Sequence, residues 1–414
     1  MMRLCCILLL SACRAELPEV KKVIDGMAVI IREHIQWNNW PAWSKAMAPF
    51  WADGFTYDFV YPYGKTHGLR DWYLGEHLHY NEAFPGFKST NFLFLGEGSK
   101  FSSLQSYHTV QWNGSFAGVP APKSKPLIKI KDLDFYIFKD GKIEYNWCMV
   151  DVVAIMQQGG YHILPPAPLP DGINYVPPRA MDGIPSPDSN YVKPGDAEVA
   201  RKAYKQMLED DFVQKSSAAR WWADDMVWDG PGGIGDAKSR KEYVQHFLVP
   251  LHTAFPDAKL EIGSLDCEGN YCGALFYIVG THAGTWLGEA ATGKSVRIKC
   301  GMHARIDLNL EVEGCGQCGR IADAWLQMDI VEAFTQIGVD LLSRAKQPEA
   351  QEMAAEPEAQ PESLADEAEV SLSEAPGSLA RAIPSLCCLV VLLAVMAKLF
   401  KAAPGSISQE PLLA

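Results

Sequence analysis

The sequence predicts two tandem domains of the α+β class, each with helices first and a curved antiparallel sheet after them. Three observations predict this architecture: an internal repeat, the order of periodic segments within each copy, and a Pro-rich connector between the copies. The chain has 414 residues, of which 48% are hydrophobic and 21% charged, which is enough apolar material for two cores. We expect the first domain at 16–164, the connector at 165–195 and the second domain at 196–345.

The repeat consists of ordered segments that recur at a nearly constant offset. FWADGFTYD (50–58) recurs as WWADDMVWD (221–229), and AFPG at Ala83 recurs as AFPD at Ala254. DGKIEYNWCMVD of the first copy matches CGRIADAWLQMD of the second, after an insertion, NLEVEGCGQCG, in one hairpin of the second copy. Because the order is preserved throughout, these matches indicate a duplication. The prolines of the connector predict an extended, semi-stiff spacer between the copies.

Within each copy the periodicity predicts helices followed by strands. An amphipathic helix opens each copy (18–35 and 197–212), and a second helix (69–82 and 238–253) ends at a Phe-Pro pair. Four alternating runs follow, in the second copy LEIGSLDC, GALFYIVGTH, SVRIKCGMHARI and RIADAWLQMD, and a short helix closes each unit. A curved sheet wrapped around a helix leaves an apolar pocket at one end, which predicts a place for a small molecule.

Both ends of the chain carry apolar segments that predict membrane attachment. Residues 382–400 are nearly free of charge and about long enough for one transmembrane helix, with a short tail at 401–414. The acidic stretch 346–381 predicts a disordered linker. Residues 1–15 resemble a short signal peptide. With a working signal the body would be lumenal or extracellular, and without one the protein would be tail-anchored and face the cytosol.

The charge distribution argues against a nucleic-acid partner. The formal net charge is -13, and most of it comes from Glu349–Glu374, a segment without Lys or Arg. The sequence carries no basic stripe able to neutralise phosphates. We therefore expect a membrane and a small apolar ligand as partners, together with pairing of the two domains or a homodimer.

Several motifs resemble the SnoaL-like polyketide cyclase and ester cyclase family of the nuclear-transport-factor-2-like superfamily. They are GTHAGTWLGEAATGKSVRIKCGMHARI (280–306) and GRIADAWLQMDIVEAFTQIGVDLL (319–342), and more loosely AFPG, WNGSFAG and DGKIEYNWCMVDVVAIMQQGG of the first copy. The resemblance implies two tandem cone-shaped domains with helices packed in a curved antiparallel sheet. It also implies a cofactor-free intramolecular aldol ring closure, in which a pocket carboxylate moves the proton next to a carbonyl. The same fold serves non-enzymatic binding, so a lipid- or polyketide-binding or scaffold module is the alternative.

The sequence departs from the family at the position of the catalytic Asp. That position holds Cys148 in the first copy and Leu326 in the second, and neither residue can act as a carboxylate. Asp151 and Asp329, three residues further on, are the candidate bases. The alternative for both is an N-cap, because each stands directly before an expected helix.

Two histidines make the second copy our candidate for the active domain. His282 and His303 occur only there, where the first copy has Trp112 and Phe135, and an imidazole can orient or protonate a carbonyl. The alternative for each is a strand histidine bonded to a neighbouring backbone group. The expected substrate pocket consists of Arg305, Trp286 and Trp325, with Trp147, Cys148 and Asn146 in the first copy.

The cysteines of the second copy form two pairs, each in or beside a turn. Cys267 and Cys272 form one pair, and Cys315 and Cys318 form the other, and the two turns are expected at the same end of the sheet. We expect no metal and no cofactor. Free thiols are the default interpretation of the four cysteines. A four-thiolate zinc site is a remote alternative, and disulfides within or between the turns are a third interpretation if the signal peptide works.

Overall fold

The computed structural model describes residues 19–32, 37–96, 100–170, 177–179, 195–214, 219–315 and 318–345. All of them belong to the first of two units, Met1–Pro357 and Glu358–Ala414. The expected signal peptide (1–15), acidic linker (346–381), transmembrane segment (382–400) and tail (401–414) lie outside the described residues. Within the described part of the chain, no helix is long and apolar enough to span a bilayer.

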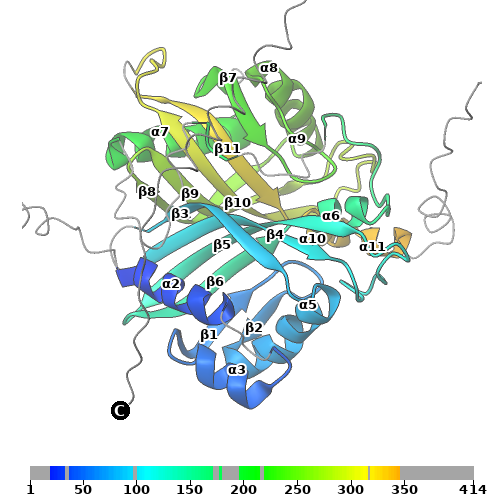
Figure 1. Ribbon diagram of the computed structural model, residues 1–414. Helices are drawn as coiled ribbons and strands as arrows, with labels where there is room; N and C mark the ends of the chain where they lie inside the picture. Colours follow the sequence, from blue (N-terminus) through cyan, green and yellow to red (C-terminus); the bar gives the residue numbers. More distant parts are fainter. Residues whose placement is uncertain are drawn as a thin grey trace, which may run out of the picture. The chain divides into compact units, whose positions relative to one another are not determined.

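The first half of the chain, residues 19–170, combines helices with one six-stranded sheet (Figure 1). Its elements are α2 (Glu19–Arg32), α3 (Trp40–Met47), β1 (Trp51–Asp58), β2 (Lys65–His67), α4 (Gly68–Trp72), η1 (Tyr73–His77), α5 (Leu78–Ala83), β3 (Lys88–Leu95), β4 (Phe101–Gln111), β5 (Leu127–Lys139), β6 (Lys142–Val150) and α6 (Val152–Gln158). The helices therefore come first and the strands of the sheet mostly after them, as predicted.

The second half, residues 195–345, repeats this order with a five-stranded sheet. Its elements are α7 (Ala197–Glu209), η2 (Asp210–Gln214), β7 (Trp222–Asp229), α8 (Arg240–Tyr243), η4 (Val244–Leu248), α9 (Val249–Ala254), β8 (Lys259–Glu268), β9 (Tyr271–Thr281), β10 (Ser295–Asp307), β11 (Arg320–Met328), α10 (Ile330–Ile337) and α11 (Leu341–Arg344). The α+β class is confirmed for both halves.

The two sheets share one strand order. The order β1-β6-β5-β4-β3 in the first half corresponds to β7-β11-β10-β9-β8 in the second, which agrees with a duplication. The four strands predicted for each copy pair antiparallel, as expected, whereas β1 with β6 and β7 with β11 are parallel. Parallel neighbours need a long crossover connection, and the helices and the other strands of each half supply it.

The second predicted helix of each copy is divided by a π-helical turn. The first half has α4, η1 and α5 in succession, and the second half has α8, η4 and α9. A π turn shifts the following side chains relative to an uninterrupted α-helix, and such turns are frequent at functional sites. In these two turns the fourth position holds Glu76 in the first half and Phe247 in the second.

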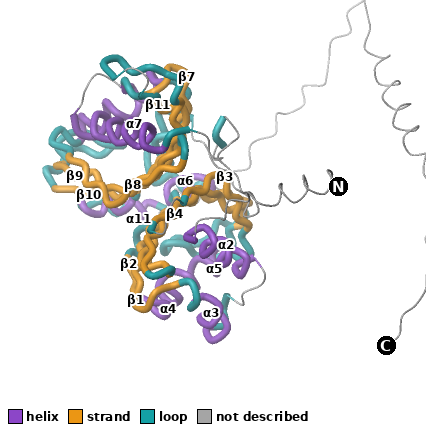
Figure 2. Tube along the Cα trace, turned by 90° about the vertical axis from the view of Figure 1, so that its left-hand side faces the viewer, coloured by secondary structure: helices purple, strands orange, loops and turns teal. Residues whose placement is uncertain are grey.

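The helices that precede the strands of each half lie over one face of its sheet (Figure 2), and the other face contacts the opposite half, where the closing helices α6 and α10 also contact each other. In the second half, Tyr204 on α7 donates a hydrogen bond to the carbonyl oxygen of Met302 on β10 at 2.7 Å. Across the halves, β11 contacts β6 and β3 contacts β9. Successive side chains of a strand point to opposite faces, so every central strand has a helix-facing row and a row facing the other half.

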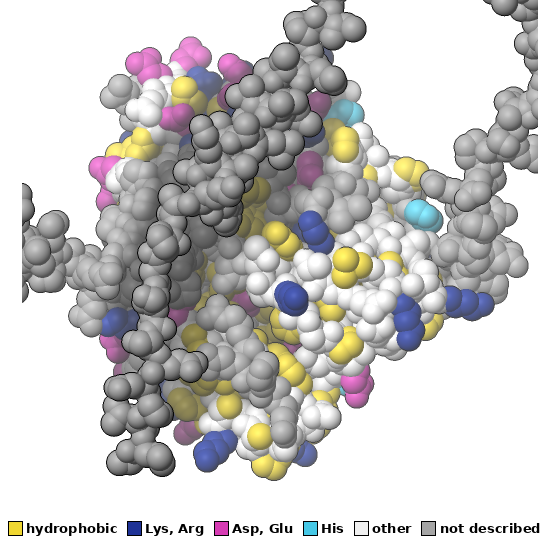
Figure 3. Space-filling view, viewed as in Figure 1, with side chains coloured by type: hydrophobic (Ala, Val, Ile, Leu, Met, Phe, Trp, Pro, Cys, Tyr) yellow, Lys and Arg dark blue, Asp and Glu magenta, His cyan; other side chains and the backbone are white. Residues whose placement is uncertain are grey.

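On the visible surface, the side chains of the described residues form few distinct groups of one chemical type. In Figure 3, Lys and Arg side chains of the described residues are scattered over the visible face, and at the top some of them lie beside Asp and Glu side chains. The side chains that bear most on chemistry are buried instead.

The four cysteines of the two turns are paired in disulfides, Cys267 with Cys272 and Cys315 with Cys318. Cys267 and Cys272 lie opposite one another in the register of β8 and β9. A disulfide sulfur cannot act as a thiolate ligand, so this pairing favours the disulfide interpretation over the zinc alternative. Cys148 and Cys300 are free and buried.

Reduction of the Cys267–Cys272 disulfide is expected to lower the free energy of unfolding by about 2 kcal/mol, because the cross-link restricts the unfolded chain. Urea unfolding with and without reductant measures the difference. The double variant Cys267→Ala/Cys272→Ala serves as the control and should respond less to reductant. An equal response of both proteins would place the stabilisation elsewhere.

Candidate functional site

Three carboxyl groups and a thiol are buried together on the helix-facing side of the first sheet. Asp132 and Asp134 alternate along β5, and Asp134 lies opposite Cys148 of β6 in the strand register. One oxygen of each aspartate and Sγ of Cys148 lie within 4.8 Å of one another. Glu76 of η1 is buried as well and is close enough to Asp134 for their charges to repel. We call these four residues the acid cluster.

The hydrogen-bond donors to the two aspartates are neutral groups. Ser106 Oγ donates to Asp132 Oδ2 at 2.7 Å, and the Cys148 thiol lies 3.7 Å from Asp132 Oδ1. Asn146 Nδ2 donates to Asp134 Oδ1 at 2.9 Å. Within the described part of the chain no Lys or Arg forms an ion pair with either aspartate, so their charge is not compensated by a cation.

Glu76 is held in the same way by a neutral donor. Trp72 Nε1 donates to Glu76 Oε2 at 2.9 Å, one helical turn earlier. The side chain is buried beneath the aromatic rings of the helical layer, where Trp72 packs on Tyr57 and Trp51. A carboxyl group among such rings loses hydration without gaining a counter-charge.

Burial spreads the pKa values of the three carboxyls around neutrality. Loss of hydration raises the pKa of Asp132 to about 6. Burial and the adjacent charge of Asp132 raise the pKa of Asp134 to about 7. Burial, with a further contribution from Asp134, raises the pKa of Glu76 to about 8. At pH 7 the three carboxyls therefore share protons that ordinary carboxyls would have lost.

A histidine and a tyrosine extend the cluster along β4 and α5. His108 Nε2 lies 3.5 Å from Asp132 Oδ2, and its Nδ1 lies 2.8 Å from the hydroxyl of Tyr80. Burial lowers the pKa of His108 to about 4, so the imidazole is neutral at pH 7 and the contact with Asp132 is not an ion pair. This contact joins the carboxyl of Asp132 to a neutral chain of polar groups.

The corresponding interior of the second half is apolar. β5 and β10 have equal lengths and the same neighbours, and the positions of Asp132, Asp134 and Cys148 are held there by Cys300, Met302 and Leu326. Phe247 stands where the first half has Glu76, and Trp228 where it has Tyr57. These apolar side chains are buried in the second core, and the acid cluster has no counterpart there. We therefore place the candidate site in the first half, contrary to the prediction that favoured the second copy.

The candidate bases Asp151 and Asp329 lie at helix starts, as in the alternative interpretation. Asp151 Oδ1 accepts from Ala154 N at the start of α6, and Asp329 Oδ1 accepts from Glu332 N at the start of α10, both at 2.9 Å. Their second oxygens accept backbone N–H groups of the opposite half. With both oxygens engaged, neither carboxyl is presented to the interior that holds the acid cluster.

His303 and the two strand tryptophans lie on the faces that the two halves turn toward each other. His303 stacks on Phe135 with ring centroids 5.0 Å apart, and its ring nitrogens bond to Gln105 and Ser103. Trp147 contacts Tyr277, and Trp325 contacts Phe92, in both cases across the two halves. These side chains are therefore separated from the helix-facing interior by their own sheets.

The remaining predicted residues are dispersed. Arg305 is paired with the buried carboxylate of Asp323. Trp286 packs between Phe255 and Phe334, and His282 Nδ1 lies 3.2 Å from the Thr292 hydroxyl. Of the ten residues predicted for catalysis or the substrate pocket, Cys148 and Asn146 are brought together at the acid cluster.

Sequence reasoning missed Asp132, Asp134 and Glu76. In KIKDLDFYIF two acidic residues stand at alternate positions, followed by an apolar and aromatic run, which places both on one face, and this signal could have revealed the aspartates. Glu76 lies four residues after Trp72 and four before Tyr80, so ordinary helical spacing could have placed it on their buried face. Asp132, Asp134 and Cys148 are also the side chains whose spacing could accommodate a metal ion, although hydrogen bonds within the site already engage them.

The free energy of unfolding is expected to fall as the pH rises from about 4 to 8. Carboxyls of the unfolded chain lose their protons near pH 4, whereas those of the acid cluster keep them in the folded chain until pH 6 to 8. The folded state then binds more protons, and each extra proton costs about 1.4 kcal/mol of stability per pH unit. In Asp134→Asn the free energy of unfolding should fall less steeply with pH, because one carboxyl fewer keeps its proton in the folded chain. Urea unfolding across this pH range measures both slopes, and identical slopes would contradict the assignment.

Comparison with known proteins places the second half in a family. Residues 198–337 match the family model described as SnoaL-like polyketide cyclase. None of the curated proteins matches the chain.

Solved structures similar to parts of the chain share low sequence identity with it. AclR, a putative hydroxylase from Streptomyces galilaeus, is 18% identical over 34% of this chain and 98% of its own, with a TM-score of 0.29. IdmH, a putative polyketide cyclase from Streptomyces antibioticus, is 21% identical over 34% of this chain and 99% of its own, with a TM-score of 0.28. A putative SnoaL-like polyketide cyclase from Jannaschia Sp. CCS1 is 16% identical over 35% and 96%, with a TM-score of 0.30. The resemblance predicted for the second copy is confirmed by the match of residues 198–337 to the SnoaL-like polyketide cyclase family model, and this match does not extend to the first copy.

Proposed function

We propose that the first half of this chain carries an acid/base site of the cyclase or isomerase type that acts on an apolar carbonyl compound. The observation that carries the proposal is the burial of three carboxyls with pKa values of about 6, 7 and 8, with which no cation among the described residues forms an ion pair. Groups whose environments separate their pKa values around the working pH can take a proton and give one in the same reaction. The family match of the second half supports this class of chemistry.

The geometry suggests a role for each carboxyl. Asp134 lies directly opposite Cys148, the position at which the family is expected to carry its catalytic Asp, so its carboxylate would take the proton next to the substrate carbonyl. The enolate carbon would then form a bond to a second carbonyl carbon, whose oxygen would receive a proton from Glu76. Asp132 would keep the pKa of Asp134 near neutrality through its negative charge.

The energetic cost of the acid cluster favours a chemical role over a purely structural one. Each unit by which burial raises a carboxyl pKa corresponds to about 1.4 kcal/mol that disfavours the charged form. The second half shows that this fold holds apolar residues at the same positions, namely Met302, Leu326 and Phe247. Strongly perturbed carboxyls gathered in one interior are typical of functional sites.

Replacement of Asp134 by Asn is expected to lower kcat by about 100- to 10,000-fold, the usual contribution of a general base. The substrate is taken from the compounds that organic solvent extracts from the purified protein, identified by mass spectrometry. Asp211→Asn is the matched control, because Asp211 of the second half is also buried and its pKa is also raised to about 7 by burial. Its turnover should stay within about threefold of the unsubstituted protein.

The alternative function is non-catalytic binding of a lipid or polyketide in the same interior. It predicts that the extracted compound is returned unaltered after incubation with the protein. It also predicts that Asp134→Asn changes affinity without changing any rate of conversion. Unaltered compound with both Asp134→Asn and the unsubstituted protein would reject the catalytic proposal.

We also propose that residues 382–400 tether the catalytic body to a membrane, near apolar substrate. The support comes from the sequence, since this segment is apolar and follows an acidic linker. Removal of residues 382–414 should move the protein from the membrane pellet to the supernatant after cell lysis. Persistence in the pellet after that removal would contradict the tether.

A further inference from the structure

Each half of the chain inserts a lysine into the other at an equivalent position. Lys131 Nζ on β5 donates to Asp229 Oδ1 at the end of β7 at 2.5 Å. Lys299 Nζ on β10 donates to Asp58 Oδ1 at the end of β1 at 2.7 Å. All four side chains are at most 5% exposed. A buried charge whose partner is removed is strongly destabilising, so these pairs disfavour separation of the halves.

The helix-capping aspartates form a second reciprocal set of contacts. Asp151 Oδ2 accepts the backbone N–H of Gly232 at 2.7 Å, and Asp329 Oδ2 accepts that of Tyr61 at 2.8 Å. Gly232 follows β7, and Tyr61 follows β1. The same group in each half therefore reaches the same loop of the other half, as in a two-fold pair.

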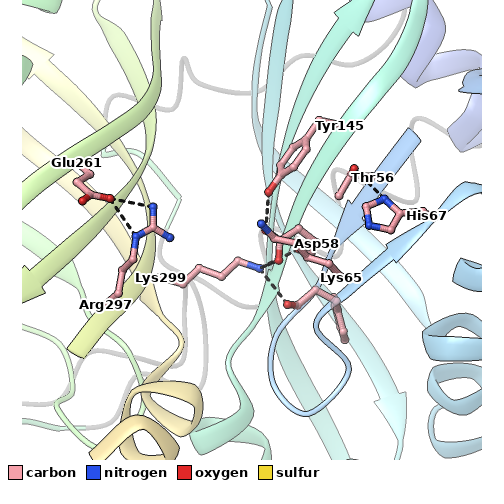
Figure 4. Close-up of polar contacts among 9 residues, drawn as sticks. Thr56, Asp58, Lys65, His67, Tyr145, Glu261, Arg297 and Lys299 are labelled. Carbon is pink, nitrogen blue, oxygen red and sulfur yellow. Dashed lines mark hydrogen bonds and ion pairs between the residues drawn. The ribbon is translucent and has the colours of Figure 1, made fainter. Parts of the chain in front are cut away.

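Figure 4 shows one of the lysine contacts next to an ion pair that stays within one half. Lys299 extends from β10 to the end of β1, where Asp58 also accepts a hydrogen bond from the Tyr145 hydroxyl. Arg297, two residues earlier on the same strand, pairs with Glu261 of β8 instead. One strand thus offers a buried ion pair across the halves and a half-exposed ion pair within the second half.

The two halves place different residues at the centre of their contact. A Cβ at Gly301 of β10 would lie 2.7 Å from Leu133 Cδ2 and 3.0 Å from the Phe135 ring. The position in β5 that corresponds to Gly301 is Leu133 itself. In a pair of two first halves, Leu133 would face a second Leu133, although the space admits only a glycine. In a pair of two second halves, Gly301 would face a second Gly301 and leave a void.

The polar residues at this centre also differ between the two halves. His303 bonds to Gln105 at 2.8 Å and to Ser103 at 2.7 Å, both on β4 of the first half. The corresponding positions on β9 of the second half are Leu275 and Gly273, and the first half has Phe135 in place of His303. Neither half presents both the histidine and its partners.

We infer that this face of the first half is specific for the second half and rejects a second copy of itself, so that the second half serves as a built-in partner. Leu133 and Phe135, which contact the second half, alternate on β5 with Asp132 and Asp134. The second half therefore packs against the face of β5 opposite to the face that carries the acid cluster. The pairing itself does not depend on the proposed function.

The test uses the full chain with a protease site inserted within 180–194, so that both halves fold before the connector is cut. Native mass spectrometry of the cut protein is expected to show one first half bound to one second half. Gly301→Leu should weaken this complex at least tenfold through contact with Leu133. The exchange Leu133→Gly/Gly301→Leu should restore part of it, because the large and the small residue trade sides.

Charge variants provide a second measurement that does not depend on core packing. Lys299→Met should also promote dissociation of the cut halves at least tenfold, whereas Arg297→Met should leave the complex intact. Pairs of two first halves, or equal dissociation of Lys299→Met and Arg297→Met, would overturn the inference. So would an intact complex with Gly301→Leu.

Discussion

The structure depends on the alternation of side chains along one strand, β5. Asp132 and Asp134 point to the helices of their own half, while Lys131, Leu133 and Phe135 point to the second half. One strand thus carries both the most polar part of the interior and the centre of the contact between the halves. A shift of its register by one residue would bring carboxyls into that contact and hydrophobic residues into the acid cluster.

This constraint explains why the two halves have diverged in different directions. The contact between the halves requires complementary residues. Its lysines and capping aspartates therefore occur in both halves and reach across reciprocally, whereas its central glycine occurs in the second half alone. The interior carries no such requirement, and there the second half has filled its positions with Met302, Leu326 and Phe247. A duplicated fold can keep its pairing surface in both copies and its polar interior in one.

The fold class and the strand segments could be predicted from the sequence, because period-two patterns and the repeat are local properties. The parallel pairing of β1 with β6 could not, since it depends on how the chain returns across the sheet. We expected the site in the second half because His282 and His303 occur only there, but the sequence does not give the face of the sheet on which each histidine lies. His303 shares its row with Lys299 and Arg305, and that row faces the first half. The sequence shows which residue types each strand contains, whereas the face on which each residue lies required the packing of the halves.

The two capping aspartates have a consequence for mutagenesis of this protein. Asp151 and Asp329 each satisfy one N–H of their own helix and one of the facing half, so their replacement removes two bonds at once. Loss of turnover in such a variant would be indistinguishable from the loss of a catalytic carboxylate if activity alone were assayed. An alanine scan would therefore rank these positions among the most sensitive of the chain, for mechanical and not chemical reasons.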